Sequence, residues 1–329
     1  MENIVRILGI VVPGLLWAGS VQAQSTVPSY FDLVLPSPSV INRSELSCPS
    51  VPTYTYIGET LTVKFSLIAR NEAGATTNNY SGAAFNAAIA DTTHWTNYDM
   101  NGSMGLRFAG LDANRISISS PSVSWSNGQG DFQVTLKLSR NANGEGPYNN
   151  IVIGIRPKDD DGVRLRDADY DLDVDNDGSN ERKSVGTTTL RHGRLKIANA
   201  YGSDVLPLPV DVQAQVWNGT GFVNFVDDNC TPLDGSYFTL AQVGTLPQPA
   251  TNVVGSGTLN TKGKGNIALT KPSTAITSKA ITAIRTRPDN ASTPPPVVPG
   301  LDSYLPGLGT GTFGLYRGGP VIYRRELHY

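Results

Sequence analysis

One short stretch of this 329-residue chain concentrates side chains that can bind a metal ion. Asp173, Asp175 and Asp177 are two residues apart and are followed by Gly178, which permits a sharp turn, so three carboxylates can converge on one cation. Hard oxygen ligands in an exported protein favour Ca²⁺, and Glu181 could add a ligand directly or through water. The stretch therefore predicts a structural calcium site formed by these four acids.

The same stretch fits a second interpretation. An EF-hand loop has a bidentate glutamate at its twelfth position, where this chain has Ser184. The nearby Asp159 or Asp161 could contribute a carboxylate instead. Exposed like charges are screened at physiological salt, so an acidic turn that only keeps a sheet edge soluble needs no metal. Both interpretations stay open, and a bound calcium would act by stiffening the join between two modules.

Catalytic residues are hard to find in the sequence. The three histidines, His94, His192 and His328, are far apart, and each is expected to be a surface or strand residue. The chain has no GxSxG elbow, no HExxH motif and no P-loop. The sequence therefore predicts a protein that is not an enzyme. A hydrolase with a scattered Ser-His-Asp set is the alternative, which only a folded structure can test.

Three tryptophans could stack on sugar rings. Trp95, Trp125 and Trp217 are candidates, although Trp217 lies in an alternating segment before a tight turn, where a core position is expected. Together with the acidic stretch, they define an alternative function as a calcium-dependent carbohydrate-binding module.

Strands must position these side chains, because period-two alternation dominates the chain. It is clearest in TVKFSLIAR (62–70), DFQVTLKLSR (131–140) and DVQAQVWNG (211–219). Alternation buries one face of a strand and exposes the other, which is typical of antiparallel sheets packed as sandwiches. Asn218-Gly219 separates two such runs and predicts a hairpin. The predicted fold class is all-β, with two antiparallel β-sandwich-like modules.

The chain is expected to divide into three parts. Residues 1–23 have an Arg6 n-region, an apolar run and the small residues of VQA, which predict an export signal that is cleaved after Ala23. The apolar run is too short to span a bilayer, so no membrane span is expected after cleavage. Residues 24–188 form the predicted N-terminal β module, and residues 189–329 the C-terminal one.

Two further segments carry structural expectations. SGAAFNAAIADTTHW (81–95) is the one helix-like candidate, and its weak periodicity predicts a short helix or a loop. The final residues, 311–329, predict a closing hairpin around Gly318-Gly319-Pro320.

The chain has two cysteines, Cys48 and Cys230. In an exported protein the default is a disulfide, which is the prediction here. Two unpaired thiols are the alternative. Two cysteines alone cannot form a four-ligand zinc site.

Residues 193–231, which include Asn199-Ala200-Tyr201-Gly202-Ser203 and Trp217-Asn218-Gly219, resemble the C-terminal region of the MSHA pilus biogenesis protein MshQ-like family. Residues 54–82, 146–173 and 313–329 resemble further parts of that family in the same order. This bacterial domain has no assigned function and is typically encoded with type IV pilus components. Long members carry an additional N-terminal lectin-like domain, which this chain is expected to lack, and the approach to Tyr304 lacks an expected tryptophan.

Charge and resemblance together define the predicted function. The net charge of -2 argues against a nucleic-acid partner, which requires a basic face. The resemblance implies an exported, non-enzymatic protein of type IV, MSHA-like pilus biogenesis, presentation or adhesion. Its expected partners are pilus or cell-envelope proteins, with glycans in the alternative function. The expected location is the periplasm, the pilus or the cell surface.

Overall fold

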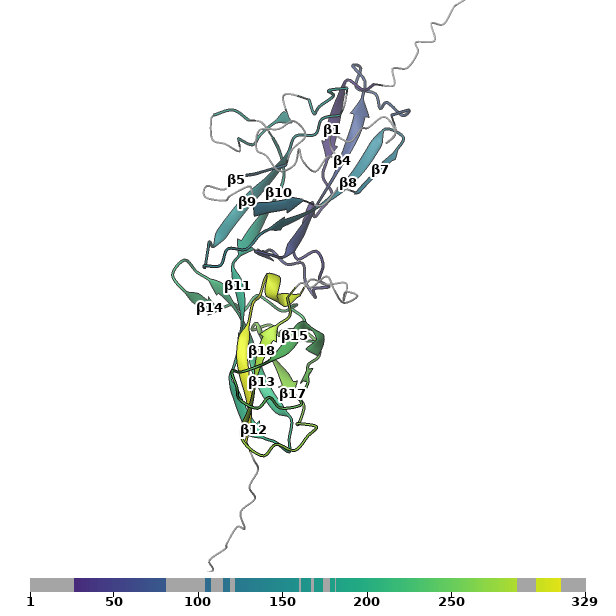
Figure 1. The fold of residues 1–329 in the computed structure, drawn as a ribbon. Helices are drawn as coiled ribbons and strands as arrows, with labels where there is room; N and C mark the ends of the chain where they lie inside the picture. Colours follow the sequence, from purple (N-terminus) through teal and green to yellow (C-terminus); the bar gives the residue numbers. More distant parts are fainter. Residues whose placement is uncertain are drawn as a thin grey trace, which may run out of the picture.

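The computed structural model shows two β modules placed end to end, with the N-terminal module in purple to teal and the C-terminal module in green to yellow (Figure 1). The structure describes residues 27–80, 104–107, 115–118, 122–159, 161–166, 169–173, 178–180, 182–288 and 300–314. The predicted export signal, the segment 81–95 and the closing hairpin beyond Gly314 lie outside these residues. Among the described residues, no helix has the length and apolar character needed to cross a membrane.

The N-terminal module consists of two facing sheets. Sheet 1 has the order β1-β4-β8-β6, with β2 paired to β4 and β7 paired to β8, and sheet 2 has the order β3-β10-β9-β5. The strands of sheet 1 are β1 (Tyr30–Val34), β2 (Val40–Ile41), β4 (Thr60–Arg70), β6 (Ile116–Ile118), β7 (Ser122–Ser126) and β8 (Gln129–Leu138). Those of sheet 2 are β3 (Thr55–Tyr56), β5 (Met104–Arg107), β9 (Tyr148–Ile155) and β10 (Lys183–Arg191).

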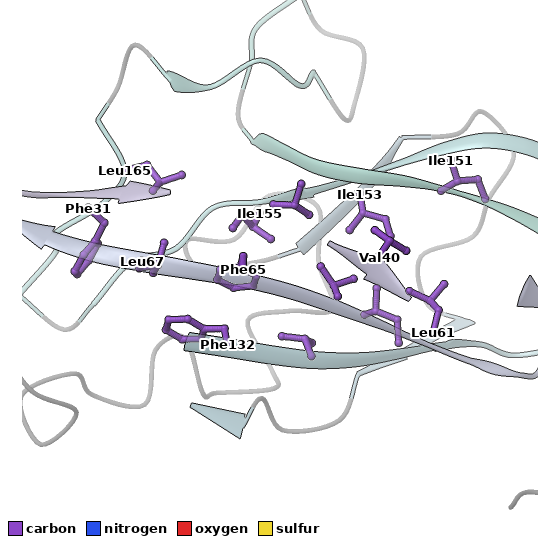
Figure 2. Close-up of a cluster of buried hydrophobic side chains, with 14 of the residues drawn as sticks. Phe31, Val40, Leu61, Phe65, Leu67, Phe132, Ile151, Ile153, Ile155 and Leu165 are labelled. Atoms are coloured by element: carbon purple, nitrogen blue, oxygen red, sulfur yellow. The ribbon is translucent and has the colours of Figure 1, made fainter. Parts of the chain in front are cut away.

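Alternation along β4 and β8 builds the core of this module. Val63 pairs with Val134 and Phe65 with Phe132 across the two strands, and the two phenylalanine rings stack at 4.9 Å between centroids. Cross-strand aromatic pairs of this kind stabilise a sheet. Figure 2 shows Phe65 and Phe132 across the core from Ile153 and Ile155 of β9, which belongs to the opposite sheet. The alternating segments at 62–70 and 131–140 are therefore the strands that the sequence predicted, with one face buried.

The C-terminal module repeats the two-sheet plan. Sheet 3 has the order β11-β13-β17-β16, with β14 paired to β13, and sheet 4 has the order β12-β19-β18-β15. The strands of sheet 3 are β11 (Gly193–Ile197), β13 (Leu208–Trp217), β14 (Phe222–Asn224), β16 (Val253–Val254) and β17 (Lys264–Leu269). Those of sheet 4 are β12 (Ala200–Ser203), β15 (Phe238–Gln242), β18 (Ala280–Thr286) and β19 (Leu308–Gly314), and two short 3-10 helices are η4 (Gly235–Tyr237) and η5 (Leu301–Ser303).

The predicted hairpin at Asn218-Gly219 connects β13 to β14. Gly219 has a φ of 105°, a conformation that glycine adopts without a steric penalty. The Asn218 side chain accepts hydrogen bonds from the backbone N–H groups of Thr220 (3.0 Å) and Gly221 (2.9 Å). The hairpin prediction is confirmed, and with it the all-β fold class of two sandwich-like modules.

The two cores are not divided cleanly by chain position. Tyr56 lies in β3 of the N-terminal module, and Tyr54 directly precedes that strand. Both nevertheless belong to the buried cluster of the C-terminal module, together with Tyr304. Position 188, where the sequence analysis divides the chain, lies inside β10, and β11 starts at Gly193. The modules therefore meet through interlocking side chains, which makes their junction the place to look for a built site.

Candidate functional site at the module junction

The predicted calcium stretch falls largely outside the described residues. Asp175, Asp177 and Glu181 are not described, and Asp173 accepts a hydrogen bond from the backbone N–H of Gly178 at 2.9 Å. Within the described ranges, no group of three or more His, Cys, Asp or Glu residues is placed to hold a metal ion. The calcium site stays a prediction.

Two acids near that stretch serve the fold itself. The Asp171 carboxylate accepts a hydrogen bond from the Ser184 N–H (2.7 Å) and forms a salt bridge with Lys183 (3.0 Å). Asp159 is buried and accepts from the Val163 N–H (2.7 Å) and the Tyr80 hydroxyl (2.9 Å). Both oxygens of Asp159, a candidate to extend the calcium site, thus hold the N-terminal module together.

The predicted disulfide forms, and it joins the two modules. Cys48 and Cys230 are 182 residues apart in sequence, and their Cα atoms lie 5.0 Å apart. In the chain-entropy description, a cross-link over such a long loop contributes about 5 kcal/mol by restricting the unfolded chain. It also brings the segment around Arg43 against the segment around Asp228.

A buried charge cluster, which we call the Arg43 cluster, lies beside the disulfide. The Arg43 guanidinium donates to the Glu59 carboxylate (3.0 Å), to Asp228 (2.8 Å) and to the Tyr54 hydroxyl (2.9 Å). The guanidinium also donates a hydrogen bond to the Thr231 hydroxyl at 2.7 Å. The side chains of Arg43 and Asp228 are 0 % exposed and that of Glu59 is 2 % exposed, so their charges depend on one another rather than on water.

Asp228 is held by donors from both modules. One oxygen accepts from Arg43 and from the backbone N–H groups of Cys230 (3.2 Å) and Thr231 (3.0 Å). The other accepts from the Tyr56 hydroxyl (2.8 Å) and the Thr231 hydroxyl (2.6 Å). Because a buried carboxylate is costly without such partners, this network requires the two modules to meet in one orientation.

Aromatic rings enclose the Arg43 cluster. The rings of Tyr54 and Tyr56 lie 5.4 Å and 4.9 Å from the guanidinium carbon of Arg43. Phe225 packs edge-on against Tyr54 at 4.8 Å, and Tyr304 stacks on Tyr56 at 6.1 Å. These rings exclude water and so strengthen the electrostatic interactions inside.

The cluster has two carboxylates for one guanidinium, and the pKa values of the two carboxylates shift in opposite directions. Burial raises the pKa of Glu59 to about 7, although Arg43 opposes the shift. Burial also acts to raise the pKa of Asp228, but Arg43 and the hydroxyl donors outweigh it and lower that pKa. Glu59 is therefore the group that binds a proton as the pH falls through neutrality.

A second contact, which we call the His192 cluster, lies elsewhere on the junction. Arg140 donates to the carbonyl of Tyr304 (3.1 Å) and to the His192 imidazole (2.6 Å). Glu145 lies 3.6 Å from the other ring nitrogen of His192 and forms a salt bridge with Arg115 at 2.7 Å. Burial and the adjacent Arg140 lower the pKa of His192 to about 4, so the imidazole is neutral at pH 7.

The structure places two of the three candidate tryptophans and one of the three histidines. Trp217 is half-buried and packs so closely on Gly144 of the N-terminal module that a Cβ there would lie 2.3 Å from its ring. Trp125 packs against Phe31 in the core of the N-terminal module. His192 is 1 % exposed, so it is a buried junction residue and not a surface one. His94, His328 and Trp95 lie outside the described residues.

The arrangement favours structural rather than catalytic chemistry. In the described part of the chain, no hydroxyl or thiol forms a hydrogen bond with His192, and both cysteines are in the disulfide. The carboxylates of both clusters are committed to fixed donors. A nucleophile, a base and an open position for substrate do not converge here.

Sequence reasoning missed the residues that build this site. Arg43, Glu59 and Asp228 are single charges in unremarkable contexts, as are Arg140 and Glu145. One signal could have located two of them. The predicted disulfide implies that the segments flanking Cys48 and Cys230 touch, and these segments contain the basic residue Arg43 and the acidic residue Asp228.

Comparison with known proteins identifies two domains of one family. Residues 26–184 match the third domain of DUF6701, and residues 191–327 match its fourth domain. No match was found among curated protein sequences.

Solved structures show only distant likeness. The Escherichia coli adhesin FdeC is 12 % identical with a TM-score of 0.24, over 88 % of this chain and 65 % of its own. The Yersinia pseudotuberculosis adhesin InvE is 10 % identical with a TM-score of 0.25, over 84 % of this chain and 61 % of its own. A Porphyromonas gingivalis protein of unknown function is 8 % identical with a TM-score of 0.22, over 87 % of this chain and 99 % of its own. This chain thus spans less than two thirds of either adhesin, and likenesses at this level say nothing about what it binds.

Proposed function

The chain belongs to the DUF6701 family, whose third and fourth domains it contains, and from this premise we propose that it is an exported, non-enzymatic surface protein of a type IV pilus system. Its role there is in assembly, presentation or adhesion, through fixed surfaces rather than a reactive cleft. The resemblance of four ordered segments to the MshQ-like family supports the link to pili.

The observation that carries this proposal is the locked junction. Domains joined by a flexible linker usually move relative to one another. Here a disulfide, the Arg43 cluster and the His192 cluster all cross between the modules. A rigid pair of sandwiches can hold a surface at a constant distance and direction from its attachment point, which is what presentation on a pilus requires.

The ionisable groups of the two clusters have structural hydrogen-bond partners, which supports a non-enzymatic role. The two buried acids of the Arg43 cluster and the buried imidazole of His192 each have assigned structural partners. A catalytic acid or base must instead be within reach of a substrate.

A gene deletion in the native host tests the proposal. We expect fewer surface pili or weaker surface attachment, restored by the wild-type gene. Complementation with Arg43→Met should fail to restore the phenotype, whereas Arg70→Met, which removes a partly exposed arginine of the N-terminal module, should restore it. Unchanged piliation and attachment after deletion would contradict the proposal. Pull-down of the tagged protein from the native envelope should recover pilins.

A further inference from the structure

The outer face of sheet 3 carries a shallow groove of about 380 Å³. Along β13, the side chains of Val210, Val212 and Ala214 point into the core, so the alternate residues face outward. We call this feature the sheet 3 groove. Its polar lining residues are Lys196, Asp211, Gln213, Asn224, Lys264 and Asn266.

Strand register arranges the lining in rows. Lys196 of β11 pairs with Gln213 of β13, which pairs in turn with Lys264 of β17. The two lysines are therefore two strands apart, about 10 Å at the backbone. Asp211 and Asn266 form the next row. Lys196 and Lys264 thus lie on either side of the Gln213 side chain. The distance between the two lysines is comparable to the length of a disaccharide unit.

The groove is positive although the whole chain is not. The chain has 26 basic and 28 acidic residues, yet Asp211 is the single acid among the described residues that line the groove. Lys196 and Lys264 are exposed, and neither forms a salt bridge within the described part of the chain. Two lysines that form no salt bridge, beside one acid, leave this face with a net positive charge that is complementary to a negatively charged ligand.

The amides of the groove are held in place. Gln213 is 9 % exposed and forms the floor of the groove, and its Nε2 donates to the carbonyls of Lys262 and Gly263, both at 3.2 Å. The Gln215 Nε2 donates to the Asn224 oxygen at 3.0 Å, which leaves the Asn224 NH₂ group as a donor. Preordered amide donors and acceptors suit hydroxyl groups, since less entropy is lost on binding.

Arg194 extends this positive face toward Phe222. Its guanidinium lies 4.1 Å from the Phe222 ring and donates to the Gln215 oxygen at 2.8 Å. Arg194 is exposed and lies two residues from Lys196 on β11, so it is on the same face of that strand. A third cation consequently continues the row of positive charge along sheet 3.

We propose that the sheet 3 groove binds a linear anionic polysaccharide. Carboxylate or sulfate groups of the polymer contact Lys196 and Lys264, and sugar hydroxyls contact the amides of Gln213 and Asn224. A protein partner would require apolar anchor pockets. Single-stranded nucleic acid would require aromatic rings for base stacking. The described lining offers neither of these, and the site is separate from the acidic stretch and needs no calcium.

Calorimetry on the intact protein tests this inference with defined polymers. Polygalacturonate supplies carboxylates, dextran sulfate supplies sulfates, and dextran is the neutral control. We expect binding of one or both anionic polymers in the presence of EDTA, no binding of dextran, and loss of affinity when salt rises from about 50 to about 500 mM. The two anionic polymers distinguish carboxylate from sulfate recognition.

Charge-reversal variants locate the site. K196E/K264E should weaken binding by at least about tenfold. The matched control K271E/K279E changes two exposed lysines between β17 and β18 and should stay within about twofold of wild type, since those residues do not line the groove. Asn224→Ala should weaken binding by about threefold with an unchanged salt dependence.

Three results would overturn the inference. They are equal binding of single-stranded DNA, an equal loss in the control variant, and unchanged binding by K196E/K264E. Piliation does not enter this test, so its outcome is independent of the proposed function.

Discussion

The Arg43 cluster and the His192 cluster both connect the two modules, but they differ in the ratio of carboxylates to guanidinium groups. The Arg43 cluster has two carboxylates for one guanidinium, and Glu59 gains a raised pKa. The His192 cluster has two guanidinium groups near one carboxylate, and His192 has a lowered pKa. Burial is the largest cause in both cases, because it disfavours the charged form: it raises the pKa of a carboxyl group and lowers the pKa of an imidazole.

The two clusters also differ in burial. The Arg43 and Glu59 side chains are 0 % and 2 % exposed, while those of Arg115 and Glu145 are 16 % and 9 % exposed. Water can replace part of a lost contact in the second cluster but not in the first. The Arg43 cluster should therefore be the more sensitive of the two to substitution.

The largest expected effect is that of Arg43→Met. This change leaves Glu59 and Asp228 buried without a counter-charge and should lower the free energy of unfolding by about 3–5 kcal/mol. Urea unfolding monitored by tryptophan fluorescence measures it. Arg70→Met, which removes a partly exposed salt bridge to Asp32, is the control and should cost less than about 1 kcal/mol. A loss for Arg43→Met as small as that of the control would refute the difference between buried and exposed pairs.

Removal of the disulfide by C48S/C230S should cost about 2–5 kcal/mol. Because the cross-link adjoins only the Arg43 cluster, hydrogen exchange should rise at the Thr231 amide, which donates to Asp228. The Trp217 amide, which donates to the His192 carbonyl at 2.9 Å, should keep its protection. Equal loss of protection at both amides would show that the junction opens as one unit.

Glu145→Gln should have a smaller effect, about 1–2 kcal/mol, because it weakens charge-assisted hydrogen bonds from Arg115 and Asn141 in a partly hydrated site. Thermal unfolding is a suitable measurement. Glu72→Gln, at an exposed position, is the matched control and should be neutral. A cost for Glu145→Gln equal to that of Arg43→Met would remove the contrast between the clusters.

Two further effects concern pH, and they have opposite signs. The pKa of Glu59 is raised from 4.5 to about 7, so its contribution is full below pH 4.5 and is lost as the pH rises through 7. The pKa of His192 is lowered from 6.5 to about 4, so its contribution is full above pH 6.5 and is lost as the pH falls through 4. The two therefore oppose each other between about pH 4.5 and 6.5.

Two variants separate these contributions. Relative to Glu59→Gln, the wild type should gain stability as the pH falls from 8 to 5, by up to about 1 kcal/mol per pH unit. Relative to His192→Gln, it should lose stability as the pH falls from 7 to 4.5. Unfolding titrations across this range provide the measurement. Parallel curves for wild type and both variants would disprove the assigned protonation.

Part of the fold could be predicted because it is encoded locally. The alternation in 62–70 and 131–140 states which face of each strand is buried without reference to any partner. The turn at Asn218-Gly219 is likewise a property of adjacent residues. The disulfide prediction followed from two cysteines and a predicted export signal, and not from geometry.

The site could not be predicted in the same way. The acidic stretch at 169–181 is conspicuous in the sequence, yet its described acids Asp171 and Asp173 bind neighbouring backbone and lysine groups. The buried acid Asp228 looks ordinary in sequence. Density of charge along the chain marks solvent exposure more often than it marks a site.

The sequence alone thus determined the class of fold, the strand faces and the covalent link between Cys48 and Cys230. Only the tertiary structure decided that Arg43 and Asp228, 185 residues apart, share one buried cluster. The physical reason is range: alternation and turn chemistry act between neighbours, whereas a buried charge is compensated by whichever residues the packed modules bring to it. The junction is therefore a property of how the two modules meet.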